Sequence, residues 1–199
     1  MEKLPYFSIE NLRITGIDPQ YLKILLYRQV RAAKIIRLKR GVYVSQRYID
    51  TIKTKGRIST LLEFLACVLY PPAYLSGEYV MHGYNLLTEL PQNFTLMTRN
   101  KTARFSNPLS NFIYHSLQER LFIGFTSIRE NSFTILKASK AKALFDFLYL
   151  RKDIIGSKKE FDELRLNLEV LSSRDKKEFK RYIALYGSPK MKRMYSMME

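Results

Sequence analysis

Positively charged side chains dominate the segment between Asp18 and Asp50, which contains no acidic residue. The cations in it are Lys23, Arg28, Arg31, Lys34, Arg37, Lys39, Arg40 and Arg47. Ammonium and guanidinium groups bind phosphate oxygens through charge-assisted hydrogen bonds. A surface that only needs to be soluble usually mixes both signs of charge. The segment therefore predicts contact with a polyanion.

One helix is expected to position the first half of these cations. Asp18 can cap it, and Pro19 suits its first position, where no amide hydrogen bond is lost. The spacing i, i+3, i+4, i+7, i+11 predicts a buried stripe of Leu22, Leu25, Leu26, Gln29 and Ala33. The opposite face then carries Gln20, Lys23, Ile24, Tyr27, Arg31 and Lys34.

That outer face has the residue types that read base edges in double-stranded DNA. Gln pairs with adenine, Lys with guanine, and Ile contacts a thymine methyl group. The cations toward its C-terminal end suit phosphates. The predicted DNA-binding residues are Gln20, Lys23, Ile24, Tyr27, Arg28, Arg31, Lys34, Arg37, Lys39 and Arg40. The alternative is an ordinary amphipathic helix, although such helices usually include Glu on the polar side.

A shorter helix is predicted just before, capped by Ser8 and ended by Gly16. Helix, glycine-containing turn and capped helix is the order of a helix-turn-helix. One departure is Leu12, at a position where such pairs usually carry a small residue. A third helix for the unit is expected from residues 47–53 or 58–69.

The stretch IIRLKRGVYV, residues 35–44, reads as a β-hairpin. A three-residue loop of Lys39, Arg40 and Gly41 would pair Leu38 with Val42 and Ile36 with Val44, with Gly41 left-handed. This register predicts an apolar underside, with Arg37 and Tyr43 on the other face. The hairpin is thus interpreted as the cationic wing of a winged helix-turn-helix.

The pattern after residue 58 predicts a second unit. We therefore expect residues 1–58 to form a DNA-binding domain and residues 59–199 to form an α+β domain. The second unit is expected to contain a helix ended by Pro71 and Pro72, a short helix from Ser76 to Gly83, and three closing helices. Four strand-like runs cover residues 94–98, 111–116, 121–128 and 133–138. Their short connections favour an antiparallel meander. The predicted fold class is α+β, with helices around a small antiparallel sheet.

The totals agree with a polyanion partner and with a cytoplasmic protein. The chain has 34 Lys and Arg residues against 18 Asp and Glu, a net charge of +16. Self-repulsion of this size is relieved by a bound polyanion. No apolar run reaches the roughly 18 residues of a membrane span, no secretory signal is visible, and the single cysteine forms no intrachain disulfide.

Catalytic and metal-binding patterns are not visible. Cys67, His82 and His115 have no metal-ligand spacing, and no phosphate loop or dinucleotide signature occurs. We interpret Cys67 as a packing residue, His82 as a hydrogen-bonding residue at a helix end, and Asp146 as a cap or ion-pair partner. The chain is therefore expected to have no cofactor, no metal and no enzymatic activity.

Three segments together resemble the AbiEi family of antitoxins from type IV toxin–antitoxin systems, over about residues 7–150. They are R-G-V-Y at Arg40–Tyr43, S-x-x-x-x-x-H-G at Ser76–Gly83 and K-A-L-x-D-x-L-Y at Lys142–Tyr149. The resemblance implies a winged-helix repressor of its own operon, with operator DNA that would contain inverted repeats. It also implies a C-terminal domain that counters a nucleotidyltransferase-like toxin, without implying direct contact.

Two other functions remain open on the sequence. An RNA-binding or anionic-surface adaptor would also use the basic segment. A winged helix fused to a nuclease-like or nucleotide-acting domain would need clustered carboxylates, and the predicted strands carry almost none. Preference for duplex DNA with inverted repeats would separate the repressor from the adaptor.

Overall fold

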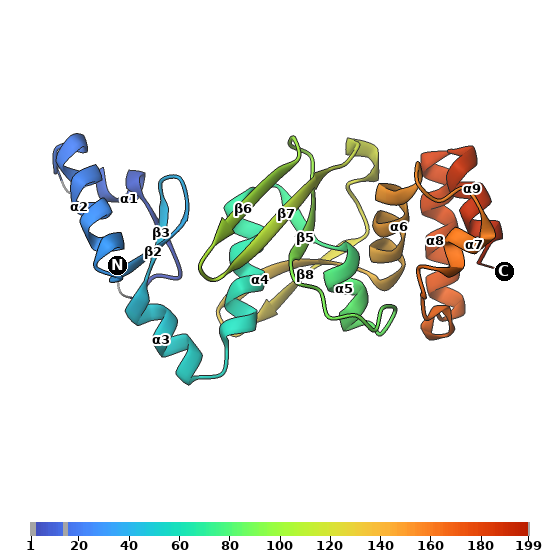
Figure 1. The fold of residues 1–199 in the computed structure, drawn as a ribbon, viewed down its shortest axis with the longest axis horizontal. Coiled ribbons are helices and arrows are strands. Elements are labelled where there is room, and N and C mark those ends of the chain that lie inside the picture. Colours follow the sequence, from blue (N-terminus) through green and yellow to red (C-terminus); the bar gives the residue numbers. More distant parts are fainter. Residues whose placement is uncertain (1–2, 14–15, 199) are drawn as a thin grey trace.

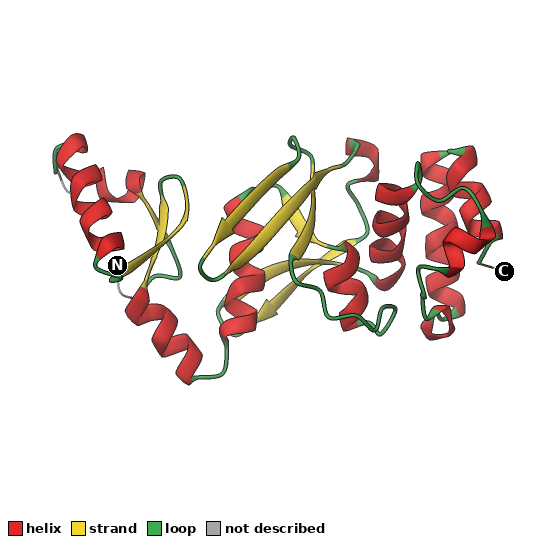
Figure 2. Cartoon of the chain, in the orientation of Figure 1, coloured by secondary structure: helices red, strands yellow, loops and turns green. Residues whose placement is uncertain are grey.

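The computed structural model describes residues 3–13 and 16–198 of the 199-residue chain. A small N-terminal unit lies at one end of the long axis, a six-stranded sheet lies in the middle, and helices α7, α8 and α9 lie at the other end (Figure 1). Helices and strands are mixed, which confirms the predicted α+β class (Figure 2). Within the described residues, no helix combines the length and apolar character that a bilayer crossing requires.

The N-terminal unit combines two helices with a three-stranded sheet. Its elements are β1 (Phe7–Ser8), α1 (Ile9–Arg13), α2 (Pro19–Arg31), β2 (Ile35–Lys39), β3 (Val42–Ser45) and α3 (Gln46–Thr54). The strands are antiparallel in the order β1-β3-β2. Strand β1 has two residues, too few to show an alternating pattern in the sequence. Its Phe7 stacks on Tyr43 of β3, with ring centroids 5.9 Å apart.

Side-chain caps begin both helices, as predicted. The carboxylate of Asp18 accepts hydrogen bonds from the backbone N–H groups of Gln20 and Tyr21, both at 2.9 Å. The hydroxyl of Ser8 accepts from the N–H of Asn11 at 3.2 Å. Both caps satisfy N–H groups that have no partner within the helix. Gly16 has a φ of +74°, and the neighbouring residues 14 and 15 of the predicted turn lie outside the described residues.

The predicted hairpin register is half correct. Ile36 pairs with Val44 as expected, but Val42 pairs with Lys39 instead of Leu38. A bulge between Arg37 and Lys39 absorbs one residue, so the loop has two residues instead of three. The bulge turns Leu38 to the buried side, which a regular two-residue hairpin would not allow. Gly41 is left-handed at φ +77°, as predicted.

The second unit is a mixed sheet with helices packed against it. Its elements are α4 (Ile58–Leu69), β4 (Ala73–Leu75), α5 (Gly77–Gly83), β5 (Phe94–Thr98), β6 (Ala103–Asn107), β7 (Ser110–Ser116), η1 (Glu119–Leu121), β8 (Phe125–Glu130), β9 (Phe133–Ala138), α6 (Lys140–Arg151), α7 (Lys158–Asp162), η2 (Leu168–Val170), α8 (Ser173–Tyr186) and α9 (Pro189–Ser196). The strand order is β6-β7-β5-β4-β9-β8.

The predicted antiparallel meander is wrong. Strand β7 runs parallel to β5, and β9 runs parallel to β4, so two pairs are joined by crossovers. Strand β4 has three residues, all buried, and sits in the middle of the sheet. A strand that is buried on both faces shows no alternation of apolar and polar residues, so its presence was not visible in the sequence.

The hairpin contributes to two hydrophobic cores. Tyr43 belongs to the small core beneath α2, together with Phe7, Leu12, Leu22 and Leu26. Leu38 and Val44, on its other face, belong to the large core of the second unit, as do Ile49 and Ile52 of α3. The side-chain amide of Asn107 also donates to the Leu38 carbonyl at 3.1 Å. Packing therefore crosses the predicted boundary at residue 58.

Candidate nucleic-acid interface

The outer face of α2 is exposed as a whole. Leu22 and Leu26 are buried at 2% and 4% exposure, and they fix which side of the helix faces the core. On the opposite side, Ile24 is 49% exposed and Tyr27 is 64% exposed, with Lys23 beside them. The predicted buried stripe is confirmed at Leu22 and Leu26, whereas Leu25 and Gln29 are only half-buried. Large apolar groups held in water at a surface are typical of a contact site.

The remaining predicted residues of α2 extend the same surface. Gln20 lies in the first turn, Arg31 is the last helical residue, and both are exposed. Arg28 is exposed at the edge of the face. Among the described residues, none of the α2 cations takes part in an ion pair, and the first turn holds no acidic residue. The face is thus positively charged.

Lys34 does not lie on this face, so its predicted position is wrong. Helix α2 ends at Arg31, and Ala33 takes a left-handed φ of +53°. The N–H of Lys34 donates to the Gln29 carbonyl at 3.0 Å, which closes the helix end. Lys34 and Gln29 instead border an apolar hollow of about 300 Å³ beneath α2. Ala33 is likewise exposed and outside the predicted buried stripe.

The hairpin tip is only partly available to a ligand. Arg37 and Arg40 are exposed. Lys39 is half-buried, and its Nζ lies 5.5 Å from the ring centroid of Phe105 on β6. Arg40 and Lys39 share a hollow with Glu10 of α1, whose carboxylate lowers the attraction for an anion. Because Arg37 and Arg40 are more exposed than Lys39, they are the stronger phosphate-binding candidates of the hairpin.

Tyr21 is a further exposed residue of this surface that the sequence prediction did not include. It is 55% exposed and lies three residues before Ile24 and seven before Arg28. This spacing places all three along one edge of the helix. The i, i+3, i+7 spacing of Tyr21, Ile24 and Arg28 is readable in the sequence, so it is the signal that could have identified Tyr21.

The cysteine and the two histidines lie in different surroundings. Cys67 is buried, burial raises the pKa of its thiol to about 11, and its Sγ exchanges hydrogen bonds with the backbone of Leu136. Burial lowers the pKa of His115. His82 was predicted to form a hydrogen bond at a helix end. Its ring nitrogen Nδ1 is buried and has no hydrogen-bond partner, so this nitrogen does not form the predicted bond. No group of His, Cys, Asp and Glu in the described part of the chain could hold a metal.

Asp146 was predicted to be a helix cap or an ion-pair partner, and it is an ion-pair partner. Its Oδ1 accepts from Lys142 Nζ at 2.7 Å, and both side chains are fully buried. Its Oδ2 accepts from the hydroxyls of Tyr74 at 2.9 Å and Ser76 at 2.7 Å. Every oxygen of the carboxylate is therefore engaged inside the protein, where no substrate reaches it. This centre joins α6 to the sheet.

Comparison with known proteins leaves the family open. No model of a known protein family matches the chain, and no curated protein has a similar sequence. The resemblance to AbiEi antitoxins therefore stays a prediction.

Proposed function

We propose that the protein is a DNA-binding transcriptional repressor that reads operator DNA with α2. The observation that carries the proposal is the outer face of α2, which presents an amide, a cation, an apolar side chain and an aromatic hydroxyl at Gln20, Lys23, Ile24 and Tyr27. Such a mixture suits base edges in the major groove. Arg28 and Arg31 then supply phosphate contacts that set the position of the helix on the duplex.

The topology of the N-terminal unit supports a winged helix-turn-helix. Helices α1 and α2 are followed by a hairpin, and β1 adds a third strand to it. In such domains the second helix of the pair enters the major groove. A hairpin beside it reaches the neighbouring backbone with its cations, here Arg37 and Arg40. The third helix is α3 or α4, which lie near the two positions predicted for it.

The antitoxin part of the proposal rests on the resemblance alone. In this view the repressor controls its own operon, and residues 59–199 counter a nucleotidyltransferase-like toxin without catalysis. The proposal also includes a cytoplasmic location, where both operator DNA and such a toxin would be found. The buried state of Asp146 and Cys67 supports a role without chemistry in the second unit.

Footprinting on the DNA upstream of its own gene tests the repressor proposal. We expect protection of a site with two related half-sites, at a protein concentration that leaves unrelated duplex DNA unprotected. RNA and single-stranded DNA of the same sequence serve as competitors. Stronger competition by RNA would instead support the adaptor function. Protection of every duplex to the same extent would contradict operator reading.

Co-expression tests the antitoxin proposal, if a neighbouring gene encodes a toxin of this class. We expect the full chain to restore growth. The variant Lys23→Ala should weaken operator binding and retain the rescue, because α2 and the second unit would serve separate tasks. Loss of rescue in this variant, with toxin and protein levels held equal, would contradict the division of tasks.

A further inference from the structure

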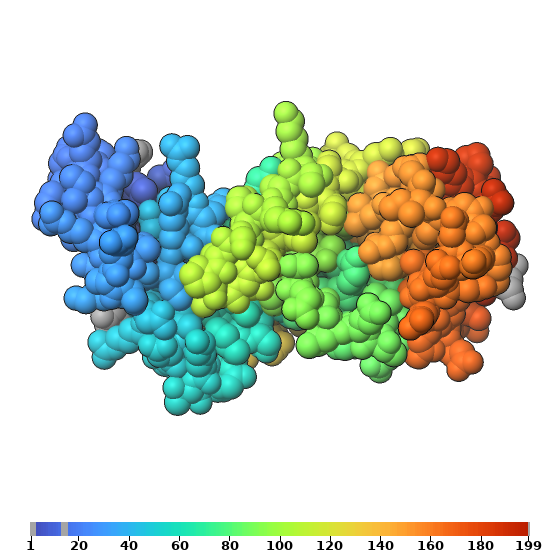
Figure 3. All heavy atoms as spheres, viewed as in Figure 1, coloured from blue at the N-terminus to red at the C-terminus, as the bar shows by residue number. Residues whose placement is uncertain are grey.

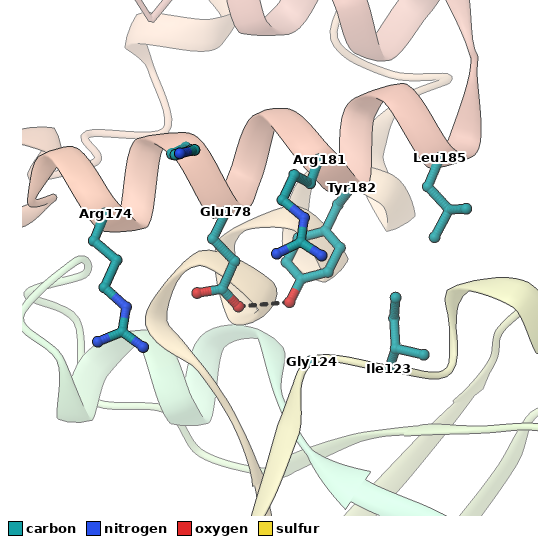
Figure 4. A pocket seen from close by; sticks show the side chains of 8 residues that line it. Ile123, Gly124, Arg174, Glu178, Arg181, Tyr182 and Leu185 are labelled. Atoms are coloured by element: carbon teal, nitrogen blue, oxygen red, sulfur yellow. Dashed lines mark hydrogen bonds between the residues drawn. The ribbon is translucent and has the colours of Figure 1, made fainter.

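A second positively charged surface lies on α8, at the far end of the molecule from α2 (Figure 1). Arg174, Lys177 and Arg181 follow the spacing i, i+3, i+7 and so share one side of this helix. All three are exposed and border a hollow of about 750 Å³ between α8 and the segment that precedes β8. Figure 4 shows Arg181 on the side of α8 that faces Gly124, and Arg174 nearer the other end of the helix. The space-filling view shows this end as a separate part of the surface from the N-terminal unit (Figure 3).

The floor of this hollow, which we call the α8 groove, is tightly built. Gly124 has a φ of +79°, and a Cβ at its position would lie 2.1 Å from the Tyr182 hydroxyl. That hydroxyl donates to Glu178 Oε1 at 2.5 Å, and the Ser139 hydroxyl donates to the same oxygen at 2.6 Å. The contacts hold α8 at a set distance from the segment that carries Gly124. The floor of the groove is therefore part of the folded structure.

The cations of the groove are not neutralised by the protein. Within the described residues, Arg174, Lys177 and Arg181 form no ion pair, whereas Arg151 pairs with Glu78 in the same unit. Glu178 is the one carboxylate lining the groove, and one of its oxygens already accepts two hydroxyl groups. Three cations around one carboxylate favour an anionic occupant.

The groove also has an apolar end. Ile123 and Leu185 are 44% and 39% exposed, although both are large apolar side chains. They face one another at one end, with Arg181 beside them and Arg174 at the opposite end (Figure 4). An occupant that satisfies both ends has an anionic part and an apolar part.

We propose that the α8 groove binds a nucleotide, with its phosphates on Arg174, Lys177 and Arg181 and its base against Ile123 and Leu185. The guanidinium fork matches phosphate oxygens in a bidentate way. The volume of about 750 Å³ lies in the range of small-molecule sites. An acidic peptide would use the same cations, and its binding is one outcome of the test below. The proposal is independent of DNA reading by α2.

Binding of adenosine and guanosine triphosphate to the full chain, measured by calorimetry, tests the site. We expect saturable binding of at least one of them, and weaker binding of pyrophosphate, which lacks the base. Arg181→Gln should weaken nucleotide affinity about tenfold or more, because it removes a charge-assisted contact. Lys176→Gln is the matched control, since Lys176 is an exposed cation of α8 that does not line the groove.

Operator binding separates this proposal from the proposed function. Arg181→Gln should leave the affinity for operator DNA unchanged, whereas Lys23→Ala should leave nucleotide binding unchanged. Equal losses of nucleotide affinity in Arg181→Gln and Lys176→Gln would overturn the assignment, because they would indicate general charge attraction. Binding of neither triphosphate at millimolar concentration would overturn it as well. Binding of an acidic peptide or an oligonucleotide in place of mononucleotides would equally contradict it.

Discussion

The ammonium group of Lys39, at the hairpin tip, lies 5.5 Å from the ring centroid of Phe105 on β6. The two residues belong to different units, and a cation over an aromatic face is attracted to it. Together with the bond from Asn107 to the Leu38 carbonyl, this contact holds the hairpin against the second sheet. The cation nearest the second unit thus serves the packing of the protein, which leaves Arg40 as the outward-facing cation of the loop.

Replacing Arg40 by Ala should weaken binding to every duplex. The slope of log affinity against log salt should flatten by about 1, the value for one phosphate contact. Lys39→Ala should change the slope less, because its side chain is engaged with Phe105. Titrations of a labelled duplex at several salt concentrations measure both slopes. An unchanged slope in Arg40→Ala would show that the tip does not reach DNA.

Base reading by α2 predicts a loss that depends on sequence. Gln20→Ala or Lys23→Ala should cost about 1–3 kcal/mol of binding free energy on the operator and clearly less on random duplex. Competition assays with both DNAs measure the difference. Arg31→Ala is the comparison, since a phosphate contact should be lost equally on both. If the losses in Lys23→Ala were also equal, α2 would contact the backbone alone.

The buried pair of Lys142 and Asp146 should dominate stability around α6. Lys142→Met removes the cation and leaves the carboxylate buried with two hydroxyl donors, at a cost of about 3–5 kcal/mol in unfolding free energy. The double variant Lys142→Met, Asp146→Leu should lose less than this, because no charge remains buried. Urea unfolding measures both. A double variant less stable than Lys142→Met would contradict the expectation.

The stabilising contribution of ionised Glu78 should be lost in acid. Burial raises the pKa of this carboxyl, but its own backbone N–H, the Arg151 guanidinium at 2.5 Å and the Thr95 hydroxyl together hold the pKa below its ordinary value. A lowered pKa in the folded state contributes stability above the unfolded value of roughly 4.3, and this contribution is lost as pH falls through the folded pKa.

The variant Glu78→Gln isolates that contribution. Its unfolding free energy should fall less between pH 5 and pH 3 than that of the unmodified protein, as measured by urea unfolding at each pH. Glu169→Gln removes an exposed carboxylate and serves as the control. Parallel pH curves for the unmodified protein and Glu78→Gln would show that Arg151 does not favour the ionised form.

Local signals in the sequence predicted the helices well, and the short strands and long-range pairing poorly. Asp18 followed by Pro19 marked the start of α2, and the leucine spacing marked its buried side, because both depend on neighbours within the helix. The end of α2 was missed, since Ala33 gives no signal for a left-handed conformation. The parallel pairing of β5 with β7 was missed because β6, which lies between them in the sequence and pairs antiparallel with β7, was not among the predicted strands.

In the candidate surface, too, contacts within one helix could be predicted and contacts between distant residues could not. Lys23, Ile24 and Tyr27 were placed correctly because one helix arranges them. Lys39 was expected to be free, and its contact with Phe105 arises only when residues far apart in the sequence come together. The α8 groove likewise needs Gly124 and Tyr182 in contact, which no spacing along the chain reveals.

The hairpin shared by two cores limits how the protein can be re-engineered. A chimera that exchanged residues up to the end of α3 for the DNA-binding unit of a known repressor would replace Leu38, Val44 and Ile49, and so remove part of the large hydrophobic core. A graft of α2 alone, with Leu22 and Leu26 retained, would leave both cores intact. If the proposed function holds, new operator specificity is therefore best sought by altering the outer face of α2 within the existing fold.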